Sequence, residues 1–183
     1  MATHTLMTAE QFDQLPEEEG RRYELLDGEL IEMPSANLEH NLILKNGLFE
    51  LEGFFRRTEI GTVVPEMEFA FGDDRFRPDL AVLLGDKLKQ ASLKRVPLTV
   101  VPDIVLEIVS PSESAINLDR KVRVYLQAGV AEVWVIYPDG QHMHAHSTGS
   151  VRLLSGADVL ETGVLPGLSM PVSSLFRLPI TRA

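Results

Sequence analysis

The spacing of apolar and polar residues changes several times along the chain, and each change marks a predicted element. Residues 22–33, RYELLDGELIEM, place Asp27 and Gly28 between two short runs that contain apolar residues. Asp-Gly between such runs is a strong short-range signal for a β-hairpin, so we predict two antiparallel strands here. Upstream, Thr8 and Gln11 have the spacing of a capping box, which predicts a short N-terminal helix.

Helical and strand patterns then alternate. Residues 37–56 carry leucines and phenylalanines near helical spacing, which predicts a long helix with Asn37 as its cap. Residues 61–74 have the pattern of a strand interrupted by Pro65, and residues 76–85 that of the next strand. The Gly-Asp-Asp turn between these two runs suits a hairpin.

The next segment, 86–101, has no clean period, and we predict a loop or an irregular helix. Residues 104–109 are apolar apart from one carboxylate, which is typical of a strand buried on both faces. A helix at 113–129 and a buried strand at 131–138 follow. We expect four side chains of this helix to face inward: Ile116, Val122, Tyr125 and Leu126.

Together these patterns predict the fold class. Strand, helix and strand at 103–137 form a βαβ-like unit, whereas 22–33 and 61–84 are antiparallel. We therefore predict a mixed sheet with flanking helices in an α/β or α+β fold. Residues 141–154 predict a hairpin of exposed strands, and the chain is expected to end with a turn and a short helix.

The length of 183 residues suits one ordinary domain, and neither an internal repeat nor a linker divides the chain. We predict a single domain over 1–183, with an N-terminal flap at 1–20 and a tail at 177–183. With 44% hydrophobic and 24% charged residues, the composition is that of a globular protein. No signal peptide or transmembrane run of about 18 apolar residues is evident, so no membrane association is expected.

The net charge of −10 counts against a broad, sequence-independent nucleic-acid surface. It does not exclude a nuclease, because an enzyme that gathers carboxylates around a divalent cation is partly acidic for that reason. The chain has no cysteine, which excludes disulfides, a thiol nucleophile and thiolate zinc sites. This composition also fits a reducing compartment, and we expect a cytoplasmic protein.

Two carboxylates stand where apolar strands are predicted. Asp79 opens the strand LAVLL, and Glu107 lies inside the strand IVLEIV. A buried charge is costly unless it is paired or binds a ligand, and Mg²⁺ takes carboxylates, carbonyls and water. The two carboxylates and the Ile108 carbonyl are therefore a candidate metal site. Otherwise Asp79 caps a turn, and Glu107 pairs with an arginine or is partly exposed.

A lysine on the following helix can complete this site. Ser110-Pro111-Ser112 breaks the strand after Glu107, and the helix beyond it carries Lys121. An ammonium group beside a metal ion stabilises the charge that builds up during phosphodiester hydrolysis. Taken alone, Lys121 would be an ordinary surface lysine, so it is a candidate only together with the carboxylates.

Asp79, Glu107 and Lys121 together resemble the signature of a known group of enzymes. A Pro-Asp pair opening one strand, an acid in the next core strand and a nearby lysine resemble the PD-(D/E)xK nuclease superfamily. More closely, the chain resembles the Uma family of restriction-endonuclease-like proteins from about Tyr23 to about Phe176. The resemblance rests on an ordered series of segments: YELLDGELIEMPS, LEH, VVPEMEF, RPDLAVL, PDIVLEIVSPS, DRKVRVYLQAGVAEVWVIYP and LPGLSM.

The resemblance implies a restriction-endonuclease-like core and Mg²⁺-dependent cleavage of DNA, with Mn²⁺ as a substitute ion. Asp79 matches the aspartate of the superfamily motif, and Glu107 matches its second acid. The usual lysine position holds Val109 instead, a departure from the superfamily, and in the nearer family the lysine corresponds to Lys121. Cutting both strands of a duplex usually needs two sites, so a homodimer is expected.

Two other functions fit the sequence. A catalytically silent binding or assembly module with the nuclease fold is compatible with the acidic charge and with Val109 at the usual lysine position. A metal-dependent enzyme acting on another phosphate ester is the third hypothesis.

Secondary candidates surround the predicted site. Superfamily members often supply a further acid from the first long helix, and the resemblance makes Glu39 this acid and places His40 toward the cleft. Glu39 is also typical of a first helical turn, where the dipole favours acids. Glu66, on the predicted strand before Asp79, is either a site residue or an exposed carboxylate. Tyr125 either orients Lys121 or the substrate, or it packs in the core.

A row of histidines remains outside this scheme. His142, His144 and His146 alternate, which places all three on one face of the predicted strand. Neighbouring rings would lie roughly 6–7 Å apart along the strand, too far for all three to bind one ion easily. We interpret the row as an exposed strand face, and we assign Tyr137 no function.

Overall fold

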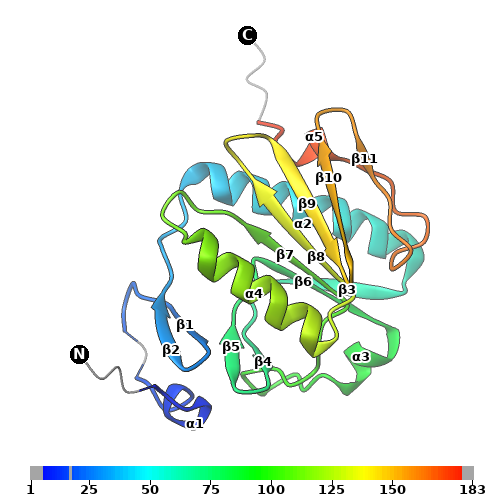
Figure 1. Ribbon diagram of the computed structural model, residues 1–183. Coiled ribbons are helices and arrows are strands. Elements are labelled where there is room, and N and C mark those ends of the chain that lie inside the picture. Colours follow the sequence, from blue (N-terminus) through cyan, green and yellow to red (C-terminus); the bar gives the residue numbers. More distant parts are fainter. Residues whose placement is uncertain (1–5, 17, 179–183) are drawn as a thin grey trace.

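A computed structural model describes residues 6–16 and 18–178. Its centre is a six-stranded mixed sheet with the order β10-β9-β8-β7-β6-β3 (Figure 1). Within it, β7 and β8 are parallel and every other neighbouring pair is antiparallel. Its strands are β3 (Gly61–Pro65), β6 (Leu80–Leu84), β7 (Ile104–Ile108), β8 (Glu132–Tyr137), β9 (His142–Ser147) and β10 (Ser150–Ser155).

A second, smaller sheet has the order β2-β1-β5-β4. Its strands are β1 (Tyr23–Leu26), β2 (Glu29–Glu32), β4 (Phe69–Phe71) and β5 (Asp74–Phe76). The hairpin predicted at 22–33 is therefore confirmed, but it does not belong to the central sheet. Two further short strands, β11 (Val159–Leu160) and β12 (Met170–Pro171), pair with each other.

Helices cover both faces of the central sheet. The described helices are α1 (Ala9–Phe12), which packs against β1 of the smaller sheet, and α2 (Leu38–Thr58), α3 (Gly85–Gln90), α4 (Ala115–Ala128) and α5 (Val172–Leu175). In Figure 1, α4 crosses the front of the sheet and α2 lies behind it. The core accordingly forms one cluster on the α2 side and another on the α4 side, with the apolar residues of the central strands divided between them.

Helix α2 follows the predicted pattern closely. The Asn37 side chain accepts a hydrogen bond from the His40 amide and caps the first turn. At Gly47 the helix lies so close to the sheet that an added Cβ would be 3.2 Å from Leu80 Cδ1. The absence of a side chain at Gly47 thus lets α2 pack directly against the strands that carry the predicted site.

The βαβ unit is also confirmed, because α4 connects the parallel strands β7 and β8. Helix α4 ends at Gly129, whose φ of 100° is in the left-handed region that glycine favours. Val122 and Tyr125 are buried as predicted, but the expectation for Ile116 is wrong, since 74% of it is exposed. Ile116 lies in the first turn, on the side of α4 that faces away from the sheet.

The prediction of a single hairpin over residues 61–85 is wrong. This segment forms two nested pairs, β3 with β6 in the central sheet and β4 with β5 in the smaller sheet, instead of one hairpin. Glu66 has a positive φ of 46° and lies in the link after β3, not on a strand. The link carries the chain from one sheet to the other, which the apolar pattern alone does not encode.

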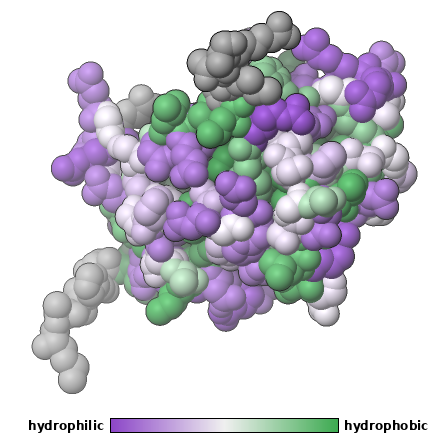
Figure 2. Space-filling model, turned by 90° about the horizontal axis from the view of Figure 1, so that it is seen from above, coloured by the Kyte–Doolittle hydropathy of each residue, from purple (hydrophilic) through white to green (hydrophobic). Residues whose placement is uncertain are grey.

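The ends of the chain are described only in part. The capping box at Thr8 and Gln11 is present, and α1 is the helix it predicts. Residues 1–5 and 17 of the predicted flap, and residues 179–183 of the predicted tail, lie outside the described residues. In the described part, no helix combines the length and the apolar character that crossing a bilayer requires. The face seen in Figure 2 is mostly polar, with separate apolar patches.

Candidate active site

The predicted site residues come together where β6 begins and β7 ends. Asp79 directly precedes β6, and its Oδ2 accepts a hydrogen bond of 2.6 Å from the Ile108 amide in β7. Its Oδ1 lies 2.8 Å from Nε2 of His40 in the first turn of α2. Both side chains keep slight access to solvent, 15% for Asp79 and 16% for His40.

Lys121 reaches the same region from α4 and is buried. Its Nζ lies 3.0 Å from Glu107 Oε1 and 2.9 Å from Glu24 Oε2. Glu24, on β1 of the smaller sheet, also accepts a hydrogen bond of 2.8 Å from the Arg77 amide. The ammonium group therefore joins a carboxylate of each sheet, and burial in this ion pair leaves Lys121 only 3% exposed.

Tyr125, one turn beyond Lys121, fixes the other side of Glu107. Its hydroxyl donates a hydrogen bond of 2.5 Å to Glu107 Oε1, and its ring packs edge-on against Phe71 and Phe76. Tyr125 is thus a core residue, which is one of the two predictions made for it. Its hydroxyl contacts Glu107 instead of Lys121, so the predicted role in orienting Lys121 stays a prediction. Among the described residues, none donates a hydrogen bond to the second oxygen, Glu107 Oε2.

Burial and charge shift the pKa values of this cluster. Burial raises the pKa of Glu107 to about 8, because the opposing charge of Lys121 does not offset it and Glu24 adds repulsion. Burial by itself lowers the pKa of Lys121, but Glu107 and Glu24 raise it above its ordinary value. Lys121 therefore stays a cation at neutral pH, and the pKa of Glu107 lies above its ordinary value in spite of that cation.

The pKa of His40 is raised, as is that of Lys121. Burial lowers the pKa of His40, but the hydrogen bond and charge of Asp79, with Glu66 and Glu113, outweigh burial and raise it. The contact places His40 in the candidate site, whereas Glu39 beside it is exposed. Glu66 is also exposed and pairs with Arg22 at 2.5 Å, and its charge contributes to the raised pKa of His40.

Two acids of this region were not singled out in the sequence. Glu24 interrupts the apolar run of β1 just as Glu107 interrupts β7, so the same signal was available for it. Glu113 follows the Ser-Pro-Ser turn, and burial raises its pKa. Glu113 also lines a cavity of about 160 Å³ together with Val109 and Tyr137, beside the end of β7.

The chemistry of the donor set suits a small, hard cation. The described residues contain no group of three or more His, Asp or Glu side chains arranged to hold a metal ion. The predicted set needs only two carboxylates and a carbonyl, and Mg²⁺ commonly keeps several waters. Among the described residues, Glu107 Oε2 has no hydrogen-bond donor, and each Asp79 oxygen has one partner. Carboxylate oxygens keep free lone pairs in this state, so these residues fit such an ion.

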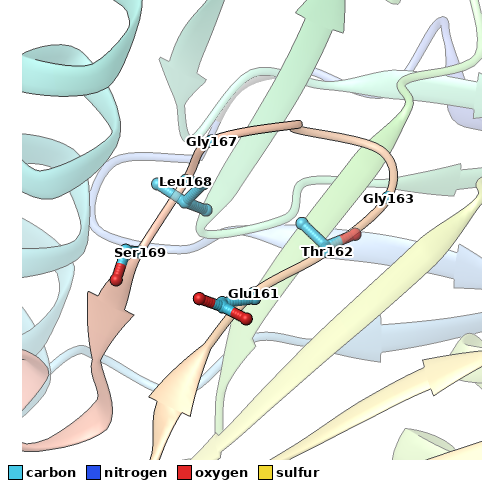
Figure 3. A pocket seen from close by; sticks show the side chains of 6 residues that line it. All are labelled: Glu161, Thr162, Gly163, Gly167, Leu168 and Ser169. Atoms are coloured by element: carbon cyan, nitrogen blue, oxygen red, sulfur yellow. The ribbon is translucent and has the colours of Figure 1, made fainter.

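A larger hollow lies elsewhere. It measures about 450 Å³ and is lined by residues of the loop between β11 and β12, among them Glu161, Thr162 and Ser169 (Figure 3). None of the candidate site residues lines it. Its walls hold one carboxylate, two small hydroxyl residues, two glycines and Leu168, so its size alone gives no reason to place the chemistry there.

Comparison with known proteins bears on the fold and the family. The sequence profile of Uma2, described as "Putative restriction endonuclease", matches residues 9–173. The chain belongs to the Uma2 family. Uma2 membership confirms the resemblance drawn from the sequence and supports a nuclease-like function. No curated protein matches the sequence significantly.

A solved structure confirms the fold of this Uma2 chain. It is the crystal structure of a protein from Anabaena variabilis, described as a "putative nuclease belonging to DUF820". The two chains are 21% identical and superpose with a TM-score of 0.81, over 93% of this chain and 97% of the other. At this identity the similarity concerns the fold, which is the mixed α/β architecture predicted from the sequence.

Proposed function

We propose that the protein is a Mg²⁺-dependent endodeoxyribonuclease of the PD-(D/E)xK type, with Mn²⁺ able to replace Mg²⁺. Asp79, Glu107 and the Ile108 carbonyl would hold the ion, and Lys121 would be the catalytic cation. The observation that carries this proposal is the 3.0 Å contact between Lys121 Nζ and Glu107 Oε1. It supports the idea that a lysine on α4 takes the place of the one missing at Val109.

Each residue has a defined task in this proposal. The Ile108 amide and His40 hold the Asp79 carboxylate in one orientation. Lys121 offers a cation to the charge that develops on the phosphate. When bound, the ion would supply Lewis-acid polarisation of the phosphate and would lower the pKa of water.

The remaining candidates have supporting tasks. Tyr125 is a positioning residue that orients Glu107 through its hydroxyl. Glu39 would be an accessory acid, because it lies in the exposed first turn of α2 beside His40. Glu66 would tune His40 by its charge.

DNA is the proposed substrate, and a homodimer is the proposed assembly because cleavage of a duplex needs two sites. A cytoplasmic location and a single domain over 1–183 stay predictions. A silent nuclease-like binding module is the second candidate. The paired state of Lys121, which is closed off by two carboxylates, favours that alternative.

Cleavage of a panel of linear, supercoiled and single-stranded DNA, with RNA alongside, tests the proposal. We expect cleavage only with Mg²⁺ or Mn²⁺, and a loss of about 100-fold or more in Asp79→Ala and Lys121→Ala. Asp86→Ala and Lys89→Ala are matched controls, since this pair lies exposed on α3. Folded wild-type protein that binds DNA but cleaves nothing would support the silent module instead.

A further inference from the structure

On the α4 side of the central sheet, no described helix lies over the strands β9 and β10 (Figure 1). Helix α4 covers β6 to β8, and in Figure 1 it does not cross β9 and β10. On this side, His146 pairs across the strands with Val151, and His144 with Leu153. These four residues define what we call the β9–β10 face. Val151 is 58% exposed and Leu153 64%, although most solvent-facing sites on edge strands are polar.

The β9–β10 face is neutral in a strongly acidic protein. The chain carries a net charge of −10, so two copies repel each other over most of their surfaces. Burial lowers the pKa of His144 and of His146, which keeps both imidazoles uncharged at neutral pH. Two copies can therefore approach along the margin of this neutral, apolar face without repulsion.

The edge of β10 adds a backbone argument. Ser147 and Ser150 are the paired residues next to the turn of the β9–β10 hairpin. Because hydrogen-bonded and non-hydrogen-bonded pairs alternate along antiparallel strands, the backbone N–H and C=O groups of Val151 and Leu153 point away from β9, toward the outer edge. No described residue forms a backbone hydrogen bond with those outer groups. An open edge of this kind is a template for another strand, and an antiparallel copy of β10 matches it by symmetry.

We propose that β10 pairs with β10 of a second copy of this chain, which joins the two central sheets into one continuous sheet and sets the two β9–β10 faces side by side. The proposal rests on the homodimer proposed above and names its interface. With the two-fold axis at Arg152, Val151 of each copy lies opposite Leu153 of the other. The two Arg152 side chains then face each other, and the repulsion is reduced by Glu132 of the same chain, 4.0 Å from Arg152.

Light scattering after size exclusion tests the interface. At tens of micromolar, we expect the wild type at about 40.8 kDa, twice the chain mass of 20.4 kDa. Leu153→Glu should return it to 20.4 kDa, and Leu93→Glu, at a residue that is 94% exposed, should leave the dimer intact. A monomeric wild type, a dimeric Leu153→Glu or a monomeric Leu93→Glu would each overturn the proposal.

A cross-linking experiment tests the register without relying on disruption. The chain has no cysteine, and residues on the axis of such a pair have Cα atoms about 4.5–5.5 Å apart, within reach of a disulfide. Mild oxidation should therefore link Arg152→Cys into a covalent dimer, whereas Phe49→Cys, exposed on α2, should stay unlinked. Equal linking of both variants would contradict this register. Neither readout measures cleavage, so a failed interface and a failed nuclease assignment are distinguishable.

Discussion

At the scale of single residues, Glu107 contributes to the pH dependence of the stability of the metal-free protein. Its pKa in the folded protein is about 8, above the ordinary value of 4.5. The folded state therefore binds more protons than the unfolded state between these values, and stability falls as pH rises through this window. In Glu107→Gln we expect this loss to be smaller by an amount on the order of a few kcal/mol.

Denaturant unfolding at pH 6, 7, 8 and 9 with a chelator present measures this difference. Glu39→Gln is the matched control, because Glu39 is an exposed acid on α2. It should keep the wild-type pH dependence. Identical profiles for wild type and Glu107→Gln would show that Glu107 is ionised throughout.

Lys121 gives a second test at the residue scale. Lys121→Met leaves Glu24 and Glu107 buried without their shared cation, and breaking such a pair typically costs about 3–5 kcal/mol. Glu24→Gln in the same chain removes the stranded charge of Glu24. We therefore expect the double variant to be more stable than Lys121→Met alone, measured by urea unfolding. A double variant that is less stable would contradict the shared ion pair.

The sequence predicted the central residues of this cluster and missed others for a physical reason. Asp79 and Glu107 stand out because a carboxylate in an apolar strand needs a partner. Glu24 follows the same rule, but the nearby Asp-Gly turn already accounts for this segment as a hairpin, so the sequence pattern did not mark its carboxylate as a site residue. The His40 contact with Asp79 depends on how the first turn of α2 meets the sheet, which spacing along the chain does not determine.

At the scale of elements, α2 contains two glycines with opposite consequences. An added Cβ at Gly53 would meet only Arg57 Nη1 at 3.7 Å, whereas one at Gly47 would press on Leu80. Gly53→Ala should raise the free energy of unfolding by about 0.5–1 kcal/mol, and Gly47→Val should lower it by about 1–3 kcal/mol. Thermal unfolding of the two variants checks this; equal shifts would mean that α2 does not pack closely at Gly47.

Long elements with a clear period were predicted well, and short ones were not. The long helix, the βαβ unit and the hairpins β1–β2 and β9–β10 have strong local signals. Strands β4 and β5 have three residues each, and their membership in a separate sheet depends on contacts with the distant strand β1. Local patterning carries no information about that choice of partner.

At the scale of the whole molecule, the proposed ion should stabilise the fold. A ligand that binds only the folded state adds about 2.7 kcal/mol at 100 times its Kd. We expect Mg²⁺ or Mn²⁺ to raise the melting temperature of the wild type, and chelation to reverse the increase. Asp79→Asn should abolish the effect and Asp86→Asn should retain it. An equal increase in both variants would place the ion elsewhere.

The ion pair of Lys121 also has a consequence for how the protein is made. Its two carboxylates and the ammonium come from segments up to 97 positions apart in the chain. Synthesis delivers Glu24 first, Glu107 much later and Lys121 last. A nascent chain that ends before the fourth helix contains the acids without their cation, so unfinished chains lack the proposed nuclease centre, and activity would begin only after most of the protein has been synthesised.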